Sequence, residues 1–382
     1  MISIKTLELF AGAGGLALGL QMAGFNHVAL YERDSAACKN LNFNIQNDFS
    51  PIKNWNVIQT DVRSVNYRQF EGKIQLLAGG PPCQPFSRGG KHKSCDDARD
   101  MFPEAIRAVR ESRPKAFIFE NVQGLLRKNF QTYFNYILLQ LQYPEIVRGD
   151  MTLQEHLSRL EKYHSFGSAD GLFYRVLFHE INAADYGIPQ NRRRVILVGF
   201  RSDFHTNWSF PFPTHSRATL EYSKWISADY WAEHNLPVPQ ENPLTSADIR
   251  NLRHNVEENI FPLQRWRTVR DALKNLSEAE NIFNNELRSG AKVYKGHSGS
   301  SLDMPSKAIK AGVHGVPGGE NMLIEDDGRV RYYTVRESAE IQTFPHNYIF
   351  VASYSENMRQ IGNAVPVELA RVIGESLYEK FK

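Results

Sequence analysis

The chain has 382 residues, of which 42% are hydrophobic and 23% charged, enough apolar material for one large core and a smaller second one. A net charge of +3 neither requires nor excludes a nucleic-acid partner, because such proteins can concentrate positive charge on one face. No apolar run is long enough to span a bilayer and the first residues show no secretory leader, so we expect a cytoplasmic protein with no membrane partner.

Cysteine usage is sparse. Cys38, Cys83 and Cys95 form no Cys-x-x-Cys pair and have no histidine partners at metal-ligand spacing. The sequence therefore predicts neither a disulfide framework nor a metal site, and Cys83, which lies among prolines, calls for another explanation.

Apolar strand-like runs alternate with helical segments from residue 1 to about 200, which is typical of a parallel sheet covered by helices on both faces. A helix is expected over 16–23, closed by Gly24, and another begins near Pro103. The expected strands are 5–10, 28–31, 55–59, 74–78 and 116–119. This order predicts an α/β fold, a doubly wound Rossmann-like sheet.

The composition changes after residue 200, where asparagine, proline, tryptophan and charged residues become more frequent. The stretch 296–319 is dense in glycine and turn residues, which favours strands and loops over long helices. A further helix is expected from Pro366 onward. We therefore expect a first domain of residues 1–200 plus 353–382, and a smaller, mostly strand-and-loop domain over 201–352.

The turn after the first strand reads Phe10-Ala-Gly-Ala-Gly-Gly15. Its spacing differs from the Gly-x-Gly-x-x-Gly pyrophosphate fingerprint, so a ligand without a pyrophosphate fits better. Glu32, after the second strand, could accept hydrogen bonds from ribose hydroxyls, and Asp61, after the third, one from an adenine amine. Each acid alone could equally be a surface charge, but the three strand ends together predict a nucleoside pocket.

The fourth strand leads into Gly79-Gly-Pro-Pro-Cys83-Gln-Pro-Phe-Ser87. Rigid prolines can aim a thiol, and a nearby cation would favour the nucleophilic thiolate. Glu120, at the next strand end, could be partly desolvated and retain a proton near neutral pH. Taken singly, a buried structural cysteine and an ordinary loop acid are commoner than catalytic groups.

Five segments share the order and rough spacing of the motifs of the DNA (cytosine-5)-methyltransferase family, which the chain resembles over nearly its whole length. These segments are Phe10-Ala-Gly-Ala-Gly-Gly15, Pro81-Pro-Cys-Gln84, Glu120-Asn-Val122, Gln190-Asn-Arg-Arg-Arg194 and Gln360-Ile-Gly-Asn-Ala-Val365. A sixth segment, 97–102, resembles another family motif with Met101 where leucine is usual, a nearly volume-conserving change. The resemblance implies methyl transfer from S-adenosylmethionine to carbon 5 of cytosine.

The resemblance also implies roles in catalysis. Cys83 would add to cytosine C6, which makes C5 a nucleophile, and Glu120 would hold the exocyclic amine and N3. Arg194 would reach the cytosine O2, and Arg192 a backbone phosphate or the catalytic loop. A fixed cation beside the thiol favours the thiolate. No residue is assigned as the base that removes the C5 proton, and a water molecule could do so.

For the cofactor, the resemblance places Phe10 against the adenine, Glu32 on the ribose and Asp61 on the adenine amine. Asn363 and Val365 would lie near the methionine end, and the glycines shape the turn. The expected cofactor residues are Phe10, Gly12, Gly14, Gly15, Glu32, Asp61, Pro82, Asn363 and Val365.

A cytosine inside a duplex cannot present C6 to a thiol, so the base has to rotate out of the helix. The loop after the cysteine is basic and glycine-rich and is expected to close over double-stranded DNA. Target recognition is expected within 201–330, above all 285–325, where each basic residue is more readily a phosphate contact than a base reader. The candidate DNA-binding residues are Ser87, Arg88, Lys91, Lys93, Arg288 and Lys307.

Other functions remain open on the sequence. A transfer-RNA cytosine-5 methyltransferase would use identical chemistry, but the sizeable recognition region favours DNA. A catalytically silent DNA-binding regulator is disfavoured by intact Cys83, Glu120 and Arg194, and a nicotinamide-dependent dehydrogenase by the glycine spacing. The compact size is typical of the methylating half of a bacterial restriction-modification pair: a monomer that works alongside a nuclease without a stable complex, although a solitary enzyme would look the same.

Overall fold

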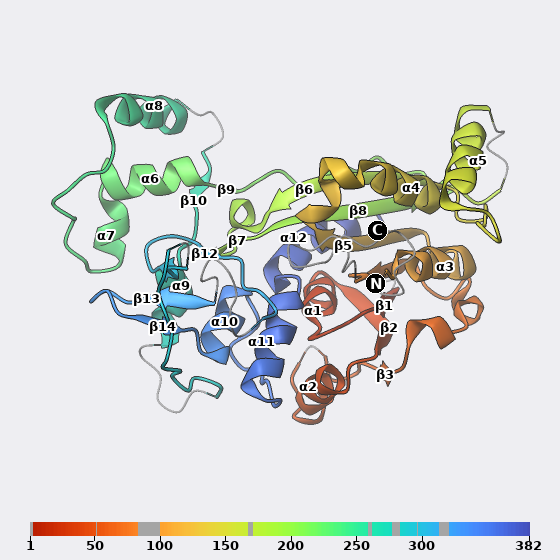
Figure 1. Ribbon diagram of the computed structural model, residues 1–382, viewed down its shortest axis with the longest axis horizontal. Helices are drawn as coiled ribbons and strands as arrows, with labels where there is room; N and C mark the ends of the chain where they lie inside the picture. The colour runs from red at the N-terminus through yellow and green to blue at the C-terminus, as the bar shows by residue number, and fades with distance from the viewer. Residues whose placement is uncertain are drawn as a thin grey trace.

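A seven-stranded sheet forms the centre of the molecule, with the strand order β3-β2-β1-β4-β5-β8-β6 (Figure 1). The structure, a computed structural model, describes residues 3–50, 52–82, 100–166, 171–258, 262–276, 283–295, 297–312 and 321–382. The strands are β1 Ile4–Leu9, β2 Phe25–Glu32, β3 Val57–Gln59, β4 Leu76–Gly79, β5 Ala116–Val122, β6 Tyr174–Asn182 and β8 Arg193–Arg201.

The strands from β3 to β5 run parallel to one another. Most of their buried residues are apolar on both faces: neighbouring Leu76 and Leu77 of β4 point to opposite sides of the sheet, and both are fully buried. Continuous apolar runs are what a strand covered on both sides requires. The predicted strands and the doubly wound α/β fold are thus confirmed.

The strands at the other edge of the sheet are antiparallel, so the expectation of a parallel sheet is wrong there. β8 runs antiparallel to both β5 and β6. Residues 183–192, which join β6 to β8, are too few for the crossover that a parallel neighbour needs. β6 has only a short apolar run, Val176–Phe178, and leaves Leu177 and Phe178 exposed at the edge, so this strand was not predicted.

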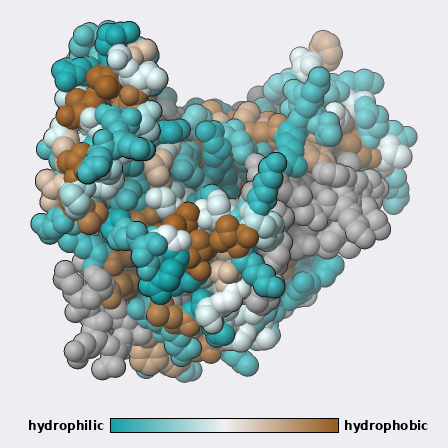
Figure 2. Space-filling model, turned by 60° about the vertical axis from the view of Figure 1, so that its left-hand side comes forward, coloured by the Kyte–Doolittle hydropathy of each residue, from teal (hydrophilic) through white to brown (hydrophobic). Residues whose placement is uncertain are grey.

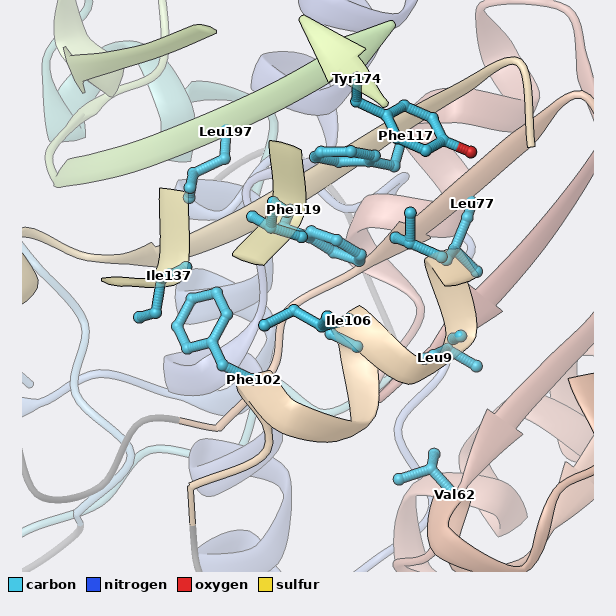
Figure 3. Close-up of a cluster of buried hydrophobic side chains, with 14 of the residues drawn as sticks. Leu9, Val62, Leu77, Phe102, Ile106, Phe117, Phe119, Ile137, Tyr174 and Leu197 are labelled. Carbon is cyan, nitrogen blue, oxygen red and sulfur yellow. The ribbon is translucent and has the colours of Figure 1, made fainter. Parts of the chain in front are cut away.

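Helices cover both faces of the sheet. α1 Gly15–Met22 and α12 Val367–Tyr378 pack on one face, where their leucines meet the strands. The opposite face holds α3 Phe102–Ser112, α4 Gln131–Gln142 and α5 Leu153–Phe166. Figure 3 shows this second core, in which Phe117 and Phe119 of β5 stack with ring centroids 5.1 Å apart above Phe102 and Ile106 of α3.

A third apolar cluster lies beside the glycine turn. It joins α1 to α2 Ser35–Gln46, α10 Val335–Ile341 and α11 Tyr354–Asn363. The Tyr348 hydroxyl donates to the carbonyl of Ala13, 2.9 Å away. Residues shortly before the predicted boundary at 352 therefore pack directly against the first sheet, and the boundary itself stays a prediction.

The region after residue 201 forms a separate group of short elements, with α6–α8 at one end of the molecule and α3–α5 towards the other (Figure 1). Strands and loops occupy much of 297–332, as the glycine content predicted, but 217–257 forms three helices that were not predicted. Two of them start at capping residues, Ser216 and Thr245. The elements are β9 His215–Ser216, α6 Arg217–Trp225, α7 Asp229–Glu233, α8 Ser246–Glu257, β10 Gln264–Arg265, α9 Val269–Leu273, β11 Ser300–Ser301, β12 Ser306–Lys307, β13 Met322–Ile324 and β14 Val330–Tyr332.

Short elements complete the chain. β7 Gln190–Asn191 pairs with β12, which links the two regions. The 3-10 helices are η1 Val62–Ser64, η2 Tyr67–Phe70, η4 Gln123–Leu126, η5 Lys128–Phe130, η6 Ala183–Tyr186 and η7 Lys274–Leu276. Within the described ranges, no helix combines the length and the apolar character needed to cross a bilayer.

Candidate active site

A cavity of about 960 Å³ opens where the parallel strands end. The carboxyl edge of a doubly wound sheet is where such folds bind ligands. Most of the predicted cofactor residues line it, but Gly14 does not. Of the predicted catalytic residues, Glu120 lines the cavity, whereas Arg192 and Arg194 do not. The predicted residues in its wall are Phe10, Gly12, Gly15, Glu32, Asp61, Pro82, Glu120, Asn363 and Val365.

The glycine turn has a backbone that few other residues would tolerate. Gly12 and Gly14 have φ of +53° and +79°, and a Cβ on Gly14 would lie 2.8 Å from Leu41 Cδ2. A Cβ on Gly15 would lie 2.3 Å from the carbonyl oxygen of Val365. The glycines therefore let the first turn touch the segment that contains Asn363 and Val365.

Glu32 fixes the turn from the end of β2. One carboxylate oxygen accepts the N–H of Gly12 at 2.8 Å, and the other accepts the N–H of Asp34 at 2.7 Å. A carboxylate can accept about four hydrogen bonds, so acceptor capacity remains for a ligand. The predicted contact with ribose hydroxyls is compatible with this geometry and stays a prediction.

Asp61 stands at the end of β3 and caps η1. Its carboxylate accepts the N–H of Arg63 at 3.0 Å and pairs with the Arg63 guanidinium at 2.6 Å. These hydrogen bonds from Arg63 hold the pKa of the Asp61 carboxyl well below its usual range. Asp61 therefore lines the cavity as an ionised acceptor, as a contact with an adenine amine would require.

Glu120 and Arg194 meet at the inner end of the site. Arg194 is paired in register with Val122 across β5 and β8, and its Nε lies 2.7 Å from Glu120 Oε1. The two side chains are only 13% and 9% exposed, and burial lowers the pKa of Arg194. Arginine titrates so far above neutrality that it keeps its charge. The structure thus brings together the acid and the cation that the motifs predicted.

The end of β4 is held against the end of β5. Asn121 donates its side-chain amide to the carbonyl of Pro81 at 3.0 Å, and the N–H of Met101 donates to the carbonyl of Pro82 at 3.2 Å. Pro82 lies in the cavity wall, as Glu120 does. Cys83, which follows Pro82 in the chain, lies outside the described residues, as do Ser87, Arg88, Lys91 and Lys93.

Arg192 does not occupy the position predicted for it. Its side chain is 0% exposed, and its terminal nitrogens donate to the carbonyls of Ile309, Gly362 and Ala364. A fully buried guanidinium whose terminal donors are engaged in this way is not presented to a phosphate. The predicted phosphate contact therefore has no support in the structure described, and the alternative contact with the catalytic loop stays a prediction, because that loop lies outside the described residues.

The basic residues of the recognition region fall into two groups. Arg265 pairs with Asp271 at 2.7 Å and Arg270 with Asp303 at 2.7 Å, so both hold the fold together. Arg288 is exposed and stacks over the ring of Tyr354 at 4.5 Å. Lys307 lies in β12, and its ammonium donates to the Ser298 hydroxyl at 3.3 Å. The DNA contacts of Arg288 and Lys307 stay predictions.

Several residues of the cavity wall were missed by the sequence reasoning, among them Glu8 and Arg359. Glu8 of β1 is 1% exposed and lies 3.3 Å from His27 Nε2, and burial raises the pKa of its carboxyl. Arg359 of α11 pairs with Asp34 at 2.7 Å. A charged residue within the apolar run Thr-Leu-Glu-Leu-Phe was a signal for Glu8, whereas nothing local distinguished Arg359.

Comparisons with known proteins agree with this site. The model of the C-5 cytosine-specific DNA methylase family matches residues 4–143 and 151–379. The chain is 32% identical over 381 residues to the type II methyltransferase M.NgoMIV of Neisseria gonorrhoeae, covering 100% of this chain and 99% of that protein. It is also 32% identical over 381 residues to the type II methyltransferase M.PspPI of Psychrobacter sp. (strain TA137), covering 98% of this chain and 79% of that protein.

Solved structures share the fold. The S. pombe Dnmt2 methyltransferase superposes with a TM-score of 0.58 at 18% identity, covering 99% of each chain. A prophage-encoded DNA modification methyltransferase of E. coli gives the same TM-score at 20% identity, again over 99% of each chain. The family model and the curated relatives identify the activity as DNA cytosine-5 methylation of the restriction-modification type, and the chain belongs to the C-5 cytosine-specific DNA methylase family.

Proposed function

We propose that this enzyme methylates C5 of a cytosine rotated out of a specific duplex sequence, through a covalent bond between Cys83 and C6, with S-adenosylmethionine as the methyl donor. The observation that carries the proposal is that Glu120, which is paired with Arg194, and Pro82 line the same cavity as the glycine turn. Cys83 follows Pro82 directly in the sequence, which supports its assignment as the nucleophile.

The cavity suits the proposed cofactor. Glu32 and Asp61 present carboxylates, which favour a ligand with hydroxyls and an amine and would repel a pyrophosphate. Phe10 offers a ring for the adenine, and Asn363 with Val365 would contain the methionine end. When bound, S-adenosylmethionine supplies a methyl group on a sulfonium centre, ready for transfer to a carbon nucleophile.

The protein's own groups would carry the remaining steps. The Cys83 thiolate gives an electron pair to C6, which shifts the ring electrons towards C5 and N3. Glu120, as a hydrogen-bond partner of N3 and the exocyclic amine, and Arg194 at O2 would stabilise that charge. Once C5 carries the methyl group and has lost its proton to water, the C6–S bond breaks and Cys83 regains its electron pair.

The recognition region would read the DNA. The surface is hollowed between two projecting parts of the molecule, which suits a duplex better than a small ligand (Figure 2). We further propose that the enzyme is a cytoplasmic monomer that protects host DNA from a partner restriction endonuclease without forming a stable complex with it. The names of the type II relatives support this role.

A trapping experiment tests the mechanism. The protein is incubated with S-adenosylmethionine and a PCR-made duplex in which 5-fluorocytosine replaces cytosine, because fluorine at C5 blocks the last elimination. We expect a complex that survives denaturation with the wild-type chain and none with Cys83→Ser. A complex that persists in Cys83→Ser would refute the adduct, and trapping on 5-fluorocytosine transfer RNA but not on duplex DNA would refute the DNA substrate.

A further inference from the structure

Arg192 is the most deeply buried charged side chain next to the active site, and its contacts cross the molecule. Nη1 donates to the carbonyl of Ile309 at 2.9 Å, while Nη2 donates to those of Gly362 at 2.7 Å and Ala364 at 2.9 Å. Burying a guanidinium is expensive, and its rigid fork of donors is what makes multiple carbonyl contacts possible. One planar group therefore fixes the spacing between two chain segments that are far apart in sequence, residues 306–311 and residues 361–365.

Other contacts bring the same two segments together. Gln190 accepts the N–H of Ile309 at 3.0 Å and donates to Gln342, whose amide donates to the carbonyl of Ile361 at 2.6 Å. A Cβ on Gly362 would lie 2.3 Å from the carbonyl carbon of Lys310, so the backbones of the two segments are in direct contact there. Among these side chains, only Arg192 contacts the backbone of both segments.

One of the two segments contributes to the proposed cofactor pocket, and the other belongs to the region expected to bind DNA. Asn363 and Val365 line the cavity, and so does Ala311, which belongs to the region expected to read DNA. Segment 306–311 also contains β12, whose pairing with β7 leads straight to Arg192 and Arg194. A displacement of segment 361–365 by a bound cofactor would therefore be transmitted to segment 306–311 and to the strand that carries Arg194.

We propose that Arg192 is a positioning residue that couples occupation of the cofactor pocket to DNA binding by the recognition region, through its simultaneous hold on segments 306–311 and 361–365. This inference rests on the proposed function, in which the cavity takes the cofactor and the recognition region takes the duplex. Coupling between two sites requires an element that both ligands bias, and this shared guanidinium is such an element.

The test is a binding cycle on the full chain with S-adenosylhomocysteine and a short duplex. The duplex carries the site that the wild-type enzyme methylates. That site is identified beforehand by bisulfite sequencing of plasmid DNA from cells that express the enzyme. Dissociation constants for the duplex are measured by fluorescence anisotropy with and without saturating S-adenosylhomocysteine. The variants are Arg192→Met, Arg192→Lys and Gly362→Ala, with Arg193→Met as the matched control, because Arg193 is 60% exposed and pairs only with Glu180 among the described side chains.

For the wild-type enzyme we expect S-adenosylhomocysteine to tighten duplex binding by about tenfold or more, within the usual range of such coupling. Arg192→Met should reduce that factor to about twofold or less, Arg192→Lys should retain part of it, and Arg193→Met should keep it. If Arg192→Met does not fold, Gly362→Ala, which forces the same backbones apart, decides the question. A coupling factor unchanged in the folded variants, or lost equally in Arg193→Met, would overturn the inference.

Failure of the proposed function gives a different result. In that case the wild-type chain would leave no methylated cytosine in the plasmid, or would not bind S-adenosylhomocysteine at all. A wild-type enzyme that methylates the duplex and binds both ligands without coupling would instead contradict only the role of Arg192.

Discussion

The sheet region and the recognition region achieve a defined shape by different means. Strands of the central sheet run for up to nine residues and bury large apolar clusters on both faces. Strands of the recognition region have two or three residues, and the apolar cluster within it has only Leu220, Tyr230 and Trp231 as its buried members. Ion pairs such as Arg265–Asp271 and Arg270–Asp303 supplement that small cluster.

Substitutions should therefore have different effects in the two regions. Close packing fixes the side chains at the strand ends of the sheet, so a conservative change there should alter chemistry or ligand binding more than folding. In the recognition region, charged contacts carry much of the tertiary structure. Stability there should respond to pH and to loss of single charges.

The largest effect is expected for Glu120→Gln in the sheet region. Glutamine keeps an acceptor for Arg194 but cannot supply a proton or a full negative charge to the cytosine, so kcat should fall by about 10²- to 10⁴-fold. Tritiated methyl transfer to plasmid DNA measures the rate, and S-adenosylhomocysteine affinity should change by less than about twofold. Glu180→Gln, on the partly exposed carboxylate that pairs with Arg193, is the control and should retain full activity. A loss of activity below about fivefold would remove Glu120 from the mechanism.

A second prediction concerns pH and the recognition region. Burial acts to raise the pKa of Asp271, but hydrogen bonds from Arg265 and the Thr268 N–H outweigh it and lower the pKa to about 2. The unfolded value is about 3.9, so this group stabilises the fold fully above about pH 4, by about 2–3 kcal/mol, and loses that contribution as pH falls through 2. About half should remain at pH 3.

Urea unfolding of the wild-type chain and Asp271→Asn at pH 6 and pH 3 measures this contribution. The difference in unfolding free energy between the two proteins should shrink at the lower pH. Asp248→Asn removes the same capping-box acid from the exposed helix α8, where no arginine is paired with it in the described structure, and should show a much smaller change. A difference for Asp271→Asn that does not depend on pH would contradict the ion-pair origin of this stability.

A third, smaller effect is expected in the cofactor turn. In Gly15→Ala the new Cβ would lie 2.3 Å from the Val365 carbonyl, so the turn and segment 361–365 must separate. Overpacking of this kind should weaken S-adenosylhomocysteine binding by about tenfold in isothermal titration calorimetry. Gly72→Ala is the control: at φ +72° with open space around it, it strains the backbone without touching the cavity. Equal losses of affinity in both variants would mean that Gly15→Ala acts through stability alone.

The sequence predicted the parts of the molecule in which local pattern and fold agree. Continuous apolar runs identified β1–β5, and the glycine turn with Glu32 identified the cavity. The family motifs assign Glu120 and Arg194 to the same base, which predicts that the two side chains lie close together, in agreement with their ion pair.

The remaining features depend on contacts that no local pattern records. β6 has one short apolar run, Val176–Phe178, and is held at the edge of the sheet by pairing with β8. The helices within 217–257 contain few apolar residues, and α8 buries none of its residues, so their composition did not indicate them. The family motif predicted that Arg192 contacts a backbone phosphate or the catalytic loop, and only the tertiary structure shows that segments more than a hundred residues away bury it.

The smallest effect tests how the recognition region holds a buried charge. Lys224 is 6% exposed, and its ammonium lies 5.6 Å from the ring centroids of both Trp225 and Trp231. It donates to the carbonyl of Asp303 at 3.1 Å. Burial lowers the pKa of this lysine, so desolvation opposes the favourable cation–ring and hydrogen-bond contacts.

We expect Lys224→Met to destabilise the protein by about 1 kcal/mol, because methionine fills the same space but leaves the carbonyl without its donor. Since the folded state binds this proton less tightly than the unfolded chain does, the wild-type protein should gain stability relative to the variant as pH rises towards about 10.4. Urea unfolding at pH 7 and pH 9 measures both effects, with Lys382→Met, an exposed lysine over Tyr378, as the control. A variant as stable as the wild-type protein at both pH values would mean that desolvation cancels the contacts, and that apolar packing governs this part of the recognition region as it does the sheet.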